Sequence, residues 1–147
     1  MAITKKEYKK MADKAAPPTA YGKNLVWAFV VGGGICTLGQ ALTNLYMNWG
    51  NELKDARAWV SITLIGISAL LTAFQIYDNI AKHAGAGTLV PITGFANSIV
   101  APAMEFKSEG YVIGIGGKMF VIAGPVLVYG IAASIIYGFI IWIFHLY

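Results

Sequence analysis

The chain is very apolar for its length. Its 147 residues are 57% hydrophobic and only 12% charged, and they carry a formal net charge of +4. A soluble domain of this size has too little interior to bury so much apolar surface, so the composition excludes a soluble globular domain. It predicts an all-α integral membrane protein.

Residues 1–22 form a basic tail. Six lysines up to Lys23 stand against Glu7 and Asp13, which gives a net charge of +4, and the charges of the remaining chain sum to zero. We expect no signal peptide here, because no short apolar core with a small-residue cleavage site follows the lysines. The positive-inside bias predicts a cytoplasmic tail whose partner is membrane lipid, rather than nucleic acid or an acidic protein.

Residues 23–147 are expected to form a single membrane domain. Three apolar stretches, residues 25–47, 58–77 and 121–144, come close to the roughly 20 residues that a spanning helix needs. Aromatic residues stand near the ends of these stretches, where lipid headgroups should lie: Trp27, Tyr46, Trp49, Trp59, Tyr77, Tyr137 and Trp142.

Uncharged polar residues follow one face of each of the first two spans. In the first span their spacing of three or four positions places them on one side of a helix: Gly33, Thr37, Gln40, Asn44 and Asn48. The second span has a similar stripe: Ser61, Ser68, Thr72 and Gln75. Such stripes either bond to a neighbouring helix or line a wet path, and packing is the more ordinary role. Gln40 and Asn44 together are more polar than packing requires.

Residues 85–104 are apolar but broken by glycine and proline. Gly85 and Gly87 loosen the chain, Pro91 suits the first turn of a helix, and Pro102 disrupts that helix near its end. The ~11 residues between the prolines reach about 17 Å, half of a hydrocarbon layer of ~30 Å. A half-length helix can lie at membrane depth only where protein or a water-filled cavity surrounds it, so a re-entrant element is predicted.

A second broken segment, residues 110–120, follows. Two such segments in succession are typical of a permeation or binding site in a channel or transporter. We expect a re-entrant pair that returns residues 105–109 to the cytoplasmic side, where residues 78–84 also lie, so that the final helix ends on the far side. A kinked but fully spanning helix over residues 86–104 is the alternative.

Two side chains in these segments have chemistry suited to a conduit. Lys118, in an apolar neighbourhood, either snorkels to the interface or meets an anion or a carboxylate such as Glu105. Asn97, between the two prolines, can offer a donor and an acceptor to a passing carboxylate. The candidate pore or ligand residues are Gln40, Asn44, Gly85, Gly87, Pro91, Thr93, Asn97, Glu105 and Lys118.

Enzyme and metal chemistry have little support in the sequence. Cys36 is the single cysteine, and His83 and His145 lack the spacing of a zinc pair. We therefore expect no metal, no cofactor and no catalytic residues. A membrane-bound enzyme is the weak alternative, because Glu105, Glu109 and His83 alone could supply an acid, base or metal cluster.

The last span carries small residues at steps of four, namely Gly130, Ser134 and Gly138. Such a stripe lets another helix approach closely. It predicts assembly with a second copy of the chain or with another membrane subunit.

Several stretches resemble the SpoVAC/SpoVAEB family of sporulation membrane proteins. They are VGGGICTLGQ, YDNIAKHAGAGTLVPITGFANSIVAPAMEFKSEG and GGKMFVIAGPVLVYG, and the resemblance covers about residues 20–140. The run from Gly85 through Gly110 is its most specific part. The basic tail is closer to the AC type of the family than to the shorter EB type.

The resemblance implies a subunit of the SpoVA complex in the inner membrane of the forespore and spore. That complex moves dipicolinic acid, largely with calcium, inward during sporulation and outward at germination. The AC type is implied to form or line the channel beside other SpoVA subunits, with opening under membrane tension. A scaffold subunit, whose partners form the pore, is the alternative. Dipicolinate is a small planar dianion, and backbone N–H groups, amides and a lysine suit its passage.

Overall fold

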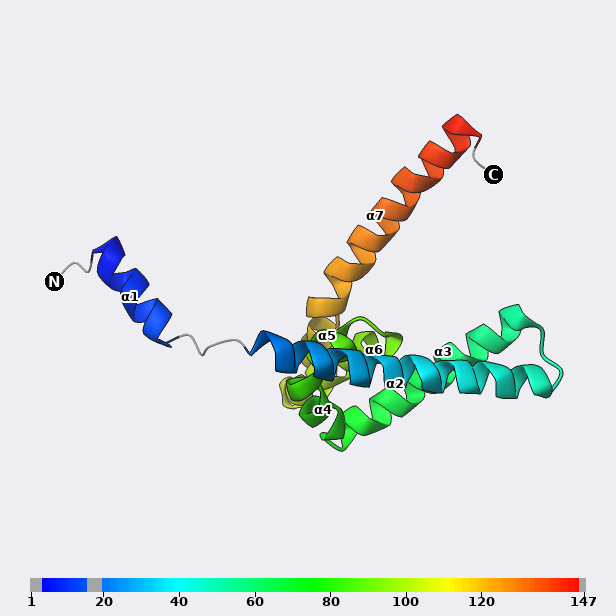
Figure 1. The fold of residues 1–147 in the computed structure, drawn as a ribbon, viewed down its shortest axis with the longest axis horizontal. Helices are drawn as coiled ribbons and strands as arrows, with labels where there is room; N and C mark the ends of the chain where they lie inside the picture. Colours follow the sequence, from blue (N-terminus) through cyan, green and yellow to red (C-terminus); the bar gives the residue numbers. More distant parts are fainter. Residues whose placement is uncertain (1–3, 16–19, 146–147) are drawn as a thin grey trace.

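The computed structural model describes residues 4–15 and 20–145. Within these ranges the chain is built of helices and contains no strand (Figure 1), which confirms the all-α fold class. Helices α2 to α6 form a bundle, and α7 projects away from it.

The tail contains a helix, α1 (Lys5–Ala15), which its charge pattern alone does not reveal. A capping box starts this helix: the Thr4 N–H donates to Glu7 Oε2 at 3.0 Å, and the Glu7 N–H donates to Thr4 Oγ1 at 3.4 Å. The hydrogen bonds from the Thr4 backbone and hydroxyl hold the pKa of exposed Glu7 below its ordinary value. Tyr8 and Met11 are exposed on this otherwise lysine-rich helix.

Three helical stretches are long and apolar enough to cross a membrane, as the sequence predicted. They are α2 (Tyr21–Asn48), α3 (Leu53–Ala73) and a run over Tyr111–Phe144 that ends in α7 (Phe120–Phe144). The first two are joined by a short turn and pack as an antiparallel pair.

Gly39 lies at the contact of α2 with α3. Gly39 faces Val60 and Leu64, since a Cβ built on this glycine would lie 3.7 Å from Leu64 and 4.0 Å from Val60. Nearer the turn, the Tyr46 hydroxyl lies 2.7 Å from Thr63 Oγ1. The absence of a side chain at residue 39 lets branched residues of α3 approach the α2 backbone closely.

Three shorter helices lie between α3 and the last span: α4 (Ile76–Ala84), α5 (Ala86–Leu89) and α6 (Ile92–Glu105). Left-handed residues mark both ends of α4, with φ of 58° at Gln75 and 49° at Gly85. Glycine adopts this conformation without the steric cost that a side chain adds. These turns direct α4 away from α3 and allow α6 to come back along it.

Helix α6 runs parallel to α3. Ser68 Oγ donates to the Thr93 carbonyl at 2.6 Å, and Thr72 Oγ1 lies 2.7 Å from Asn97 Oδ1. Both pairs are 25 positions apart, so the two helices advance in the same direction. The chain therefore reverses within α4 and α5, and α6 leads back toward the end of α3 at which α4 begins.

Glycines bring α5 into direct backbone contact with its neighbours. A Cβ on Gly87 would clash with the backbone of Ala28 on α2, and one on Gly94 would clash with the Thr88 carbonyl. A Cβ on Gly32 would lie 3.2 Å from the Gly87 carbonyl oxygen. Larger side chains at these crossings would push α5 away from α2 and α6.

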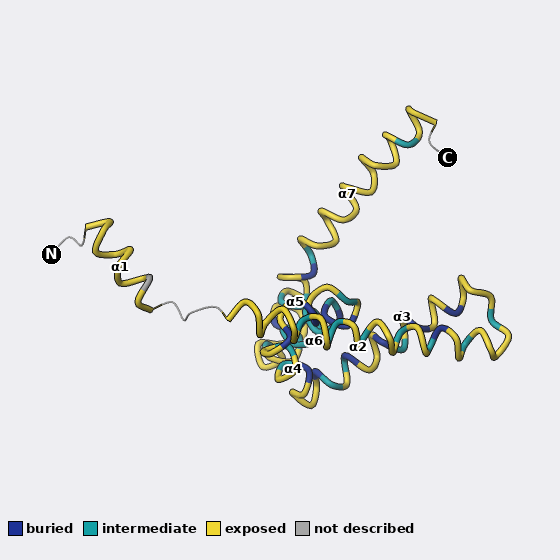
Figure 2. Tube along the Cα trace, in the orientation of Figure 1, coloured by how far each residue is buried: buried dark blue, intermediate teal, exposed yellow. Residues whose placement is uncertain are grey.

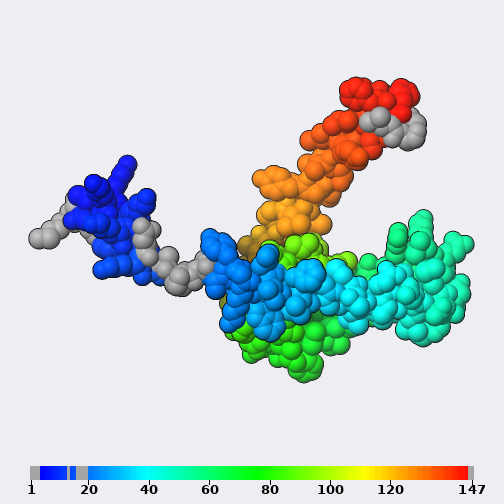
Figure 3. Space-filling model, viewed as in Figure 1, coloured from blue at the N-terminus to red at the C-terminus, as the bar shows by residue number. Residues whose placement is uncertain are grey.

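The segment between α6 and α7 is irregular but helical. A 3₁₀ helix, η1 (Phe106–Glu109), is followed by a π-helix, η2 (Tyr111–Gly116), which continues through residues 117–119 into α7. The second broken segment of the sequence is thus joined to the last span in this structure. α7 stands clear of the bundle, and its surface is exposed along almost its whole length (Figures 2 and 3).

Candidate functional site

A set of buried hydroxyl and amide groups, here named the polar cluster, joins α3, α4, α5 and α6. Its members are Ser68, Thr72, Tyr77, Thr88, Thr93 and Asn97. Five are buried, from 0% exposure at Ser68 to 5% at Thr93, and Asn97 is half-buried. In the described part of the chain, every buried side-chain nitrogen and oxygen has a hydrogen-bond partner. The cluster thus meets the requirement that buried polar groups be paired.

Tyr77 connects α4 to both α5 and α6. Its hydroxyl lies 3.0 Å from the Thr88 carbonyl and 2.9 Å from Thr93 Oγ1. Because a carbonyl can only accept, the phenol proton goes to Thr88, and the Thr93 hydroxyl can donate to the phenol oxygen. Tyr77 is only 4% exposed, so its side chain is enclosed by the protein and does not face lipid headgroups as expected. The two threonines draw its polar end inward.

Thr72 links the cluster to Asn97. Its hydroxyl oxygen lies 2.7 Å from both the Ser68 carbonyl and Asn97 Oδ1. A hydroxyl has one proton and cannot fully satisfy two acceptors at once. The Asn97 amide therefore keeps hydrogen-bonding capacity for a further partner.

A cavity of about 330 Å³, here named the acidic cavity, opens beside Thr72. Asp78 from α4 and Glu105 from α6 bring two carboxylates to it, and Gln75 adds an amide. At about 30 Å³ per water molecule the cavity could hold roughly ten. The described residues include no group of three or more His, Cys, Asp or Glu side chains that could hold a metal ion.

The predicted site residues on α5 and α6 lie in or beside this region. Thr93 and Asn97 belong to the polar cluster, and Glu105 lines the acidic cavity. Gly87 holds α5 against α2 and so supports the polar cluster. Pro91 precedes the first residue of α6 with an extended ψ of 161°, one position before the first turn in which it was expected. Gly85 supplies the left-handed turn before α5.

Gln40 and Asn44 lie elsewhere. Gln40 Nε2 donates to Asn44 Oδ1 at 2.9 Å on the exposed side of α2, and the other members of that stripe are exposed too. The α2 face that packs within the chain includes Gly32 and Gly39 instead. Of the second predicted stripe, Ser68 and Thr72 are buried in the cluster, whereas Ser61 is half-buried and Gln75 is exposed.

Lys118 lies over an aromatic ring. Its Nζ is 4.6 Å from the centroid of the Phe106 ring, a cation–π geometry that the sequence reasoning did not foresee. The ring belongs to η1, which directly follows α6. The ammonium group therefore links the start of the last span to the end of the site helix.

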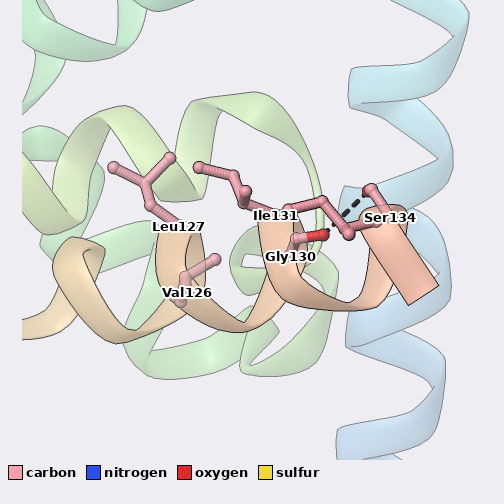
Figure 4. Close-up of a pocket in the computed structure, with 6 residues that line it drawn as sticks. Val126, Leu127, Gly130, Ile131 and Ser134 are labelled. Atoms are coloured by element: carbon pink, nitrogen blue, oxygen red, sulfur yellow. Dashed lines mark hydrogen bonds between the residues drawn. The ribbon is translucent and has the colours of Figure 1, made fainter.

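Gly130 and Ser134 line a groove of about 420 Å³ on α7 (Figure 4). Ser134 Oγ donates to the Gly130 carbonyl at 2.8 Å, so the hydroxyl is turned back to its own helix. Gly138 contributes to the next groove, of about 340 Å³, with Phe139 and Trp142. All the lining residues belong to α7, so neither groove is filled from elsewhere in the described chain.

Sequence reasoning missed Tyr77 and Thr88 as members of the site. The available signal was a pair of threonines, Thr88 and Thr93, on either side of Pro91 in an apolar segment. Hydroxyls at such positions need partners, and a tyrosine that closes the preceding span can supply one.

Comparison with known proteins identifies the family of this chain. Residues 24–140 match the family model described as SpoVAC/SpoVAEB sporulation membrane protein. The chain is 48% identical over 147 residues to Stage V sporulation protein AC of Bacillus subtilis (strain 168), covering 99% of this chain and 97% of that protein. No solved structure matches. With four fifths of its residues inside the family model and this close relative, the chain belongs to the SpoVAC/SpoVAEB family of sporulation membrane proteins.

Proposed function

We propose that this chain is a channel-forming subunit of the SpoVA complex in the inner membrane of the forespore and spore. It passes dipicolinic acid with calcium during sporulation and germination, and membrane tension favours its opening. The observation that carries the proposal is the polar cluster, which continues through Thr72 into the acidic cavity. The sporulation name of the relative supports the setting.

The depth of the cluster supports a re-entrant element. The charge-free part of α3 runs from residue 58 to Ala73, and Ser68 lies about 15 Å from its start and about 8 Å from its end, within a hydrocarbon layer of ~30 Å. Thr93 bonds to Ser68 and therefore lies at a similar level. A broken helix whose polar groups meet within the hydrocarbon layer is typical of transporter and channel sites.

The chemistry of the path suits a calcium chelate. One calcium ion and one dipicolinate dianion make a neutral pair, which needs hydroxyl and amide partners rather than a deep charged well. The half-buried Asn97 amide provides such a partner. Asp78 and Glu105 in the acidic cavity offer carboxylate oxygens, the ligand type that calcium prefers.

Flux through liposomes that contain this chain alone, measured with calcium and dipicolinate inside, tests the proposal. We expect release well above that of empty liposomes, and a clear reduction with Asn97→Leu, which removes the amide while the protein still inserts. Asn51→Leu, at the turn between α2 and α3 and outside the polar cluster, is the matched control. Absence of release from the wild-type chain, or equal release from Asn97→Leu, would contradict a conduit through the cluster.

The alternative is a scaffold subunit whose partners form the pore. The exposed surface of α7 and its unfilled grooves favour this second function. A scaffold predicts that spores with Asn97→Leu keep normal dipicolinate content and release at normal abundance of the subunit.

A further inference from the structure

A second cavity of about 400 Å³, here named the α2–α4 pocket, lies between the start of α2 and the end of α4. Tyr21, Leu25 and Ala28 line it from α2, and Lys82, His83 and Ala86 line it from the α4–α5 corner. It shares no lining residue with the polar cluster or the acidic cavity. We propose that this pocket binds an anionic phospholipid with a hydroxylated headgroup.

The position of α4 places the pocket at the membrane surface. This helix begins at Ile76, at the end of the charge-free run 58–77, and its residues are divided into an apolar side and a polar side that includes Asp78, Asn79 and Lys82. A short amphipathic helix of this kind lies along the interface between headgroups and acyl chains. The start of α2, with Lys23 just before its apolar stretch, reaches the same level because it packs against α4.

The polar end of the pocket can recognise a phosphate that carries a polyol. The Lys82 ammonium group donates to Asn79 Oδ1 at 3.3 Å, which leaves two of its three protons for phosphate oxygens. His83 Nδ1 lies 2.9 Å from the Asn79 carbonyl, so this nitrogen carries the proton and Nε2 can accept from a headgroup hydroxyl. The Trp27 ring, with its centroid 6.1 Å from that of His83, limits the movement of the imidazole.

The rest of the lining identifies the ligand as an amphiphile. Leu25, Ala28 and Ala86 offer apolar surface next to the basic residues. A free phosphate would leave that surface uncovered, whereas the glycerol and first acyl carbons of a lipid would fill it. Basic pockets between membrane helices at this level are suited to anionic headgroups.

The test uses the full-length chain in nanodiscs of phosphatidylglycerol and phosphatidylcholine. After transfer to mild detergent, native mass spectrometry measures the phosphatidylglycerol that stays bound. Lys82→Gln should lower retention about fivefold, the effect of one lysine near an anionic surface. Lys54→Gln, an exposed lysine at the other end of α3, is the matched control and should leave retention unchanged. Equal retention in Lys82→Gln and Lys54→Gln overturns the proposal.

Two further arms distinguish a lipid from a free anion. Ala86→Leu fills the apolar part of the pocket and keeps Lys82, so it should also lower retention of phosphatidylglycerol. Excess inorganic phosphate should fail to displace the lipid from the wild-type chain. Displacement by phosphate overturns the lipid assignment, as does full retention by a monodisperse Ala86→Leu variant. None of these measurements depends on solute flux, so their outcome is separate from that of the proposed channel.

Discussion

Tyr77→Phe should loosen the attachment of α4 to α5 and α6. The change removes one hydroxyl and keeps the ring, so packing around this 4% exposed side chain is preserved. Two hydrogen bonds are lost, at 3.0 Å to the Thr88 carbonyl and at 2.9 Å to Thr93 Oγ1. Side-chain hydrogen bonds in membrane proteins contribute about 0.6 to 1.7 kcal/mol each, so we expect a loss of about 1–3 kcal/mol in the free energy of unfolding.

Reversible unfolding in mixed micelles, followed by circular dichroism, measures this loss. Tyr137→Phe, on an exposed position of α7, is the control and should change stability little. Thr93→Val removes the hydroxyl that bonds to Tyr77. The double variant should therefore lose less free energy of unfolding than the sum of the losses of the two single variants. If Tyr77→Phe matches Tyr137→Phe within about 0.3 kcal/mol, the measurement would refute the view that this hydroxyl holds the cluster together.

Three other predictions concern separate parts of the chain. Gly87→Leu should destabilise the fold by several kcal/mol because the new side chain would meet the Ala28 backbone. Thermal unfolding of this variant, compared with the wild type, checks this. Gly130→Leu and Ser134→Leu should reduce co-purification of partner subunits while membrane insertion stays normal. The pKa of Glu7 is lowered in the folded tail, so its contribution to α1 is present above the ordinary value of 4.5 and is lost as pH falls through the lowered value. Circular dichroism of Glu7→Gln against wild type across that range measures it.

Length and hydropathy were sufficient to predict the three spans, because a bilayer fixes how many apolar residues a helix needs. Periodicity also placed the polar stripe of α2 and three of the four members of the second stripe on helices, but Gln75 lies beyond the end of α3. It could not indicate what each face contacts. On α3 only the middle of the stripe is buried, with Ser68 and Thr72 bonded to α6, whereas on α2 the glycines, not the amides, pack within the chain.

Local hydrogen bonds and backbone conformation explain two features that the sequence did not predict. The capping box of Thr4 and Glu7 gives the basic tail a helix, although the lysines dominate its composition. The left-handed turn that lets α4 leave the axis of α3 lies at Gln75. Because this residue is not a glycine, its identity did not indicate the turn. Because Tyr77 comes two residues after this turn, its side chain points into the cluster rather than toward headgroups.

The two uncovered surfaces of the chain support different parts of the proposal. α7 is apolar on nearly all sides, so its grooves favour a partner helix but lipid can also cover them. The α2 stripe is different, because Gln40 and Asn44 are exposed amides within a spanning helix, and lipid cannot hydrogen-bond to them. Their bond to each other uses one donor and one acceptor and leaves the remaining amide groups unpaired by that contact. In a bilayer those groups require a second subunit or water, so a single chain surrounded by lipid is an incomplete assembly.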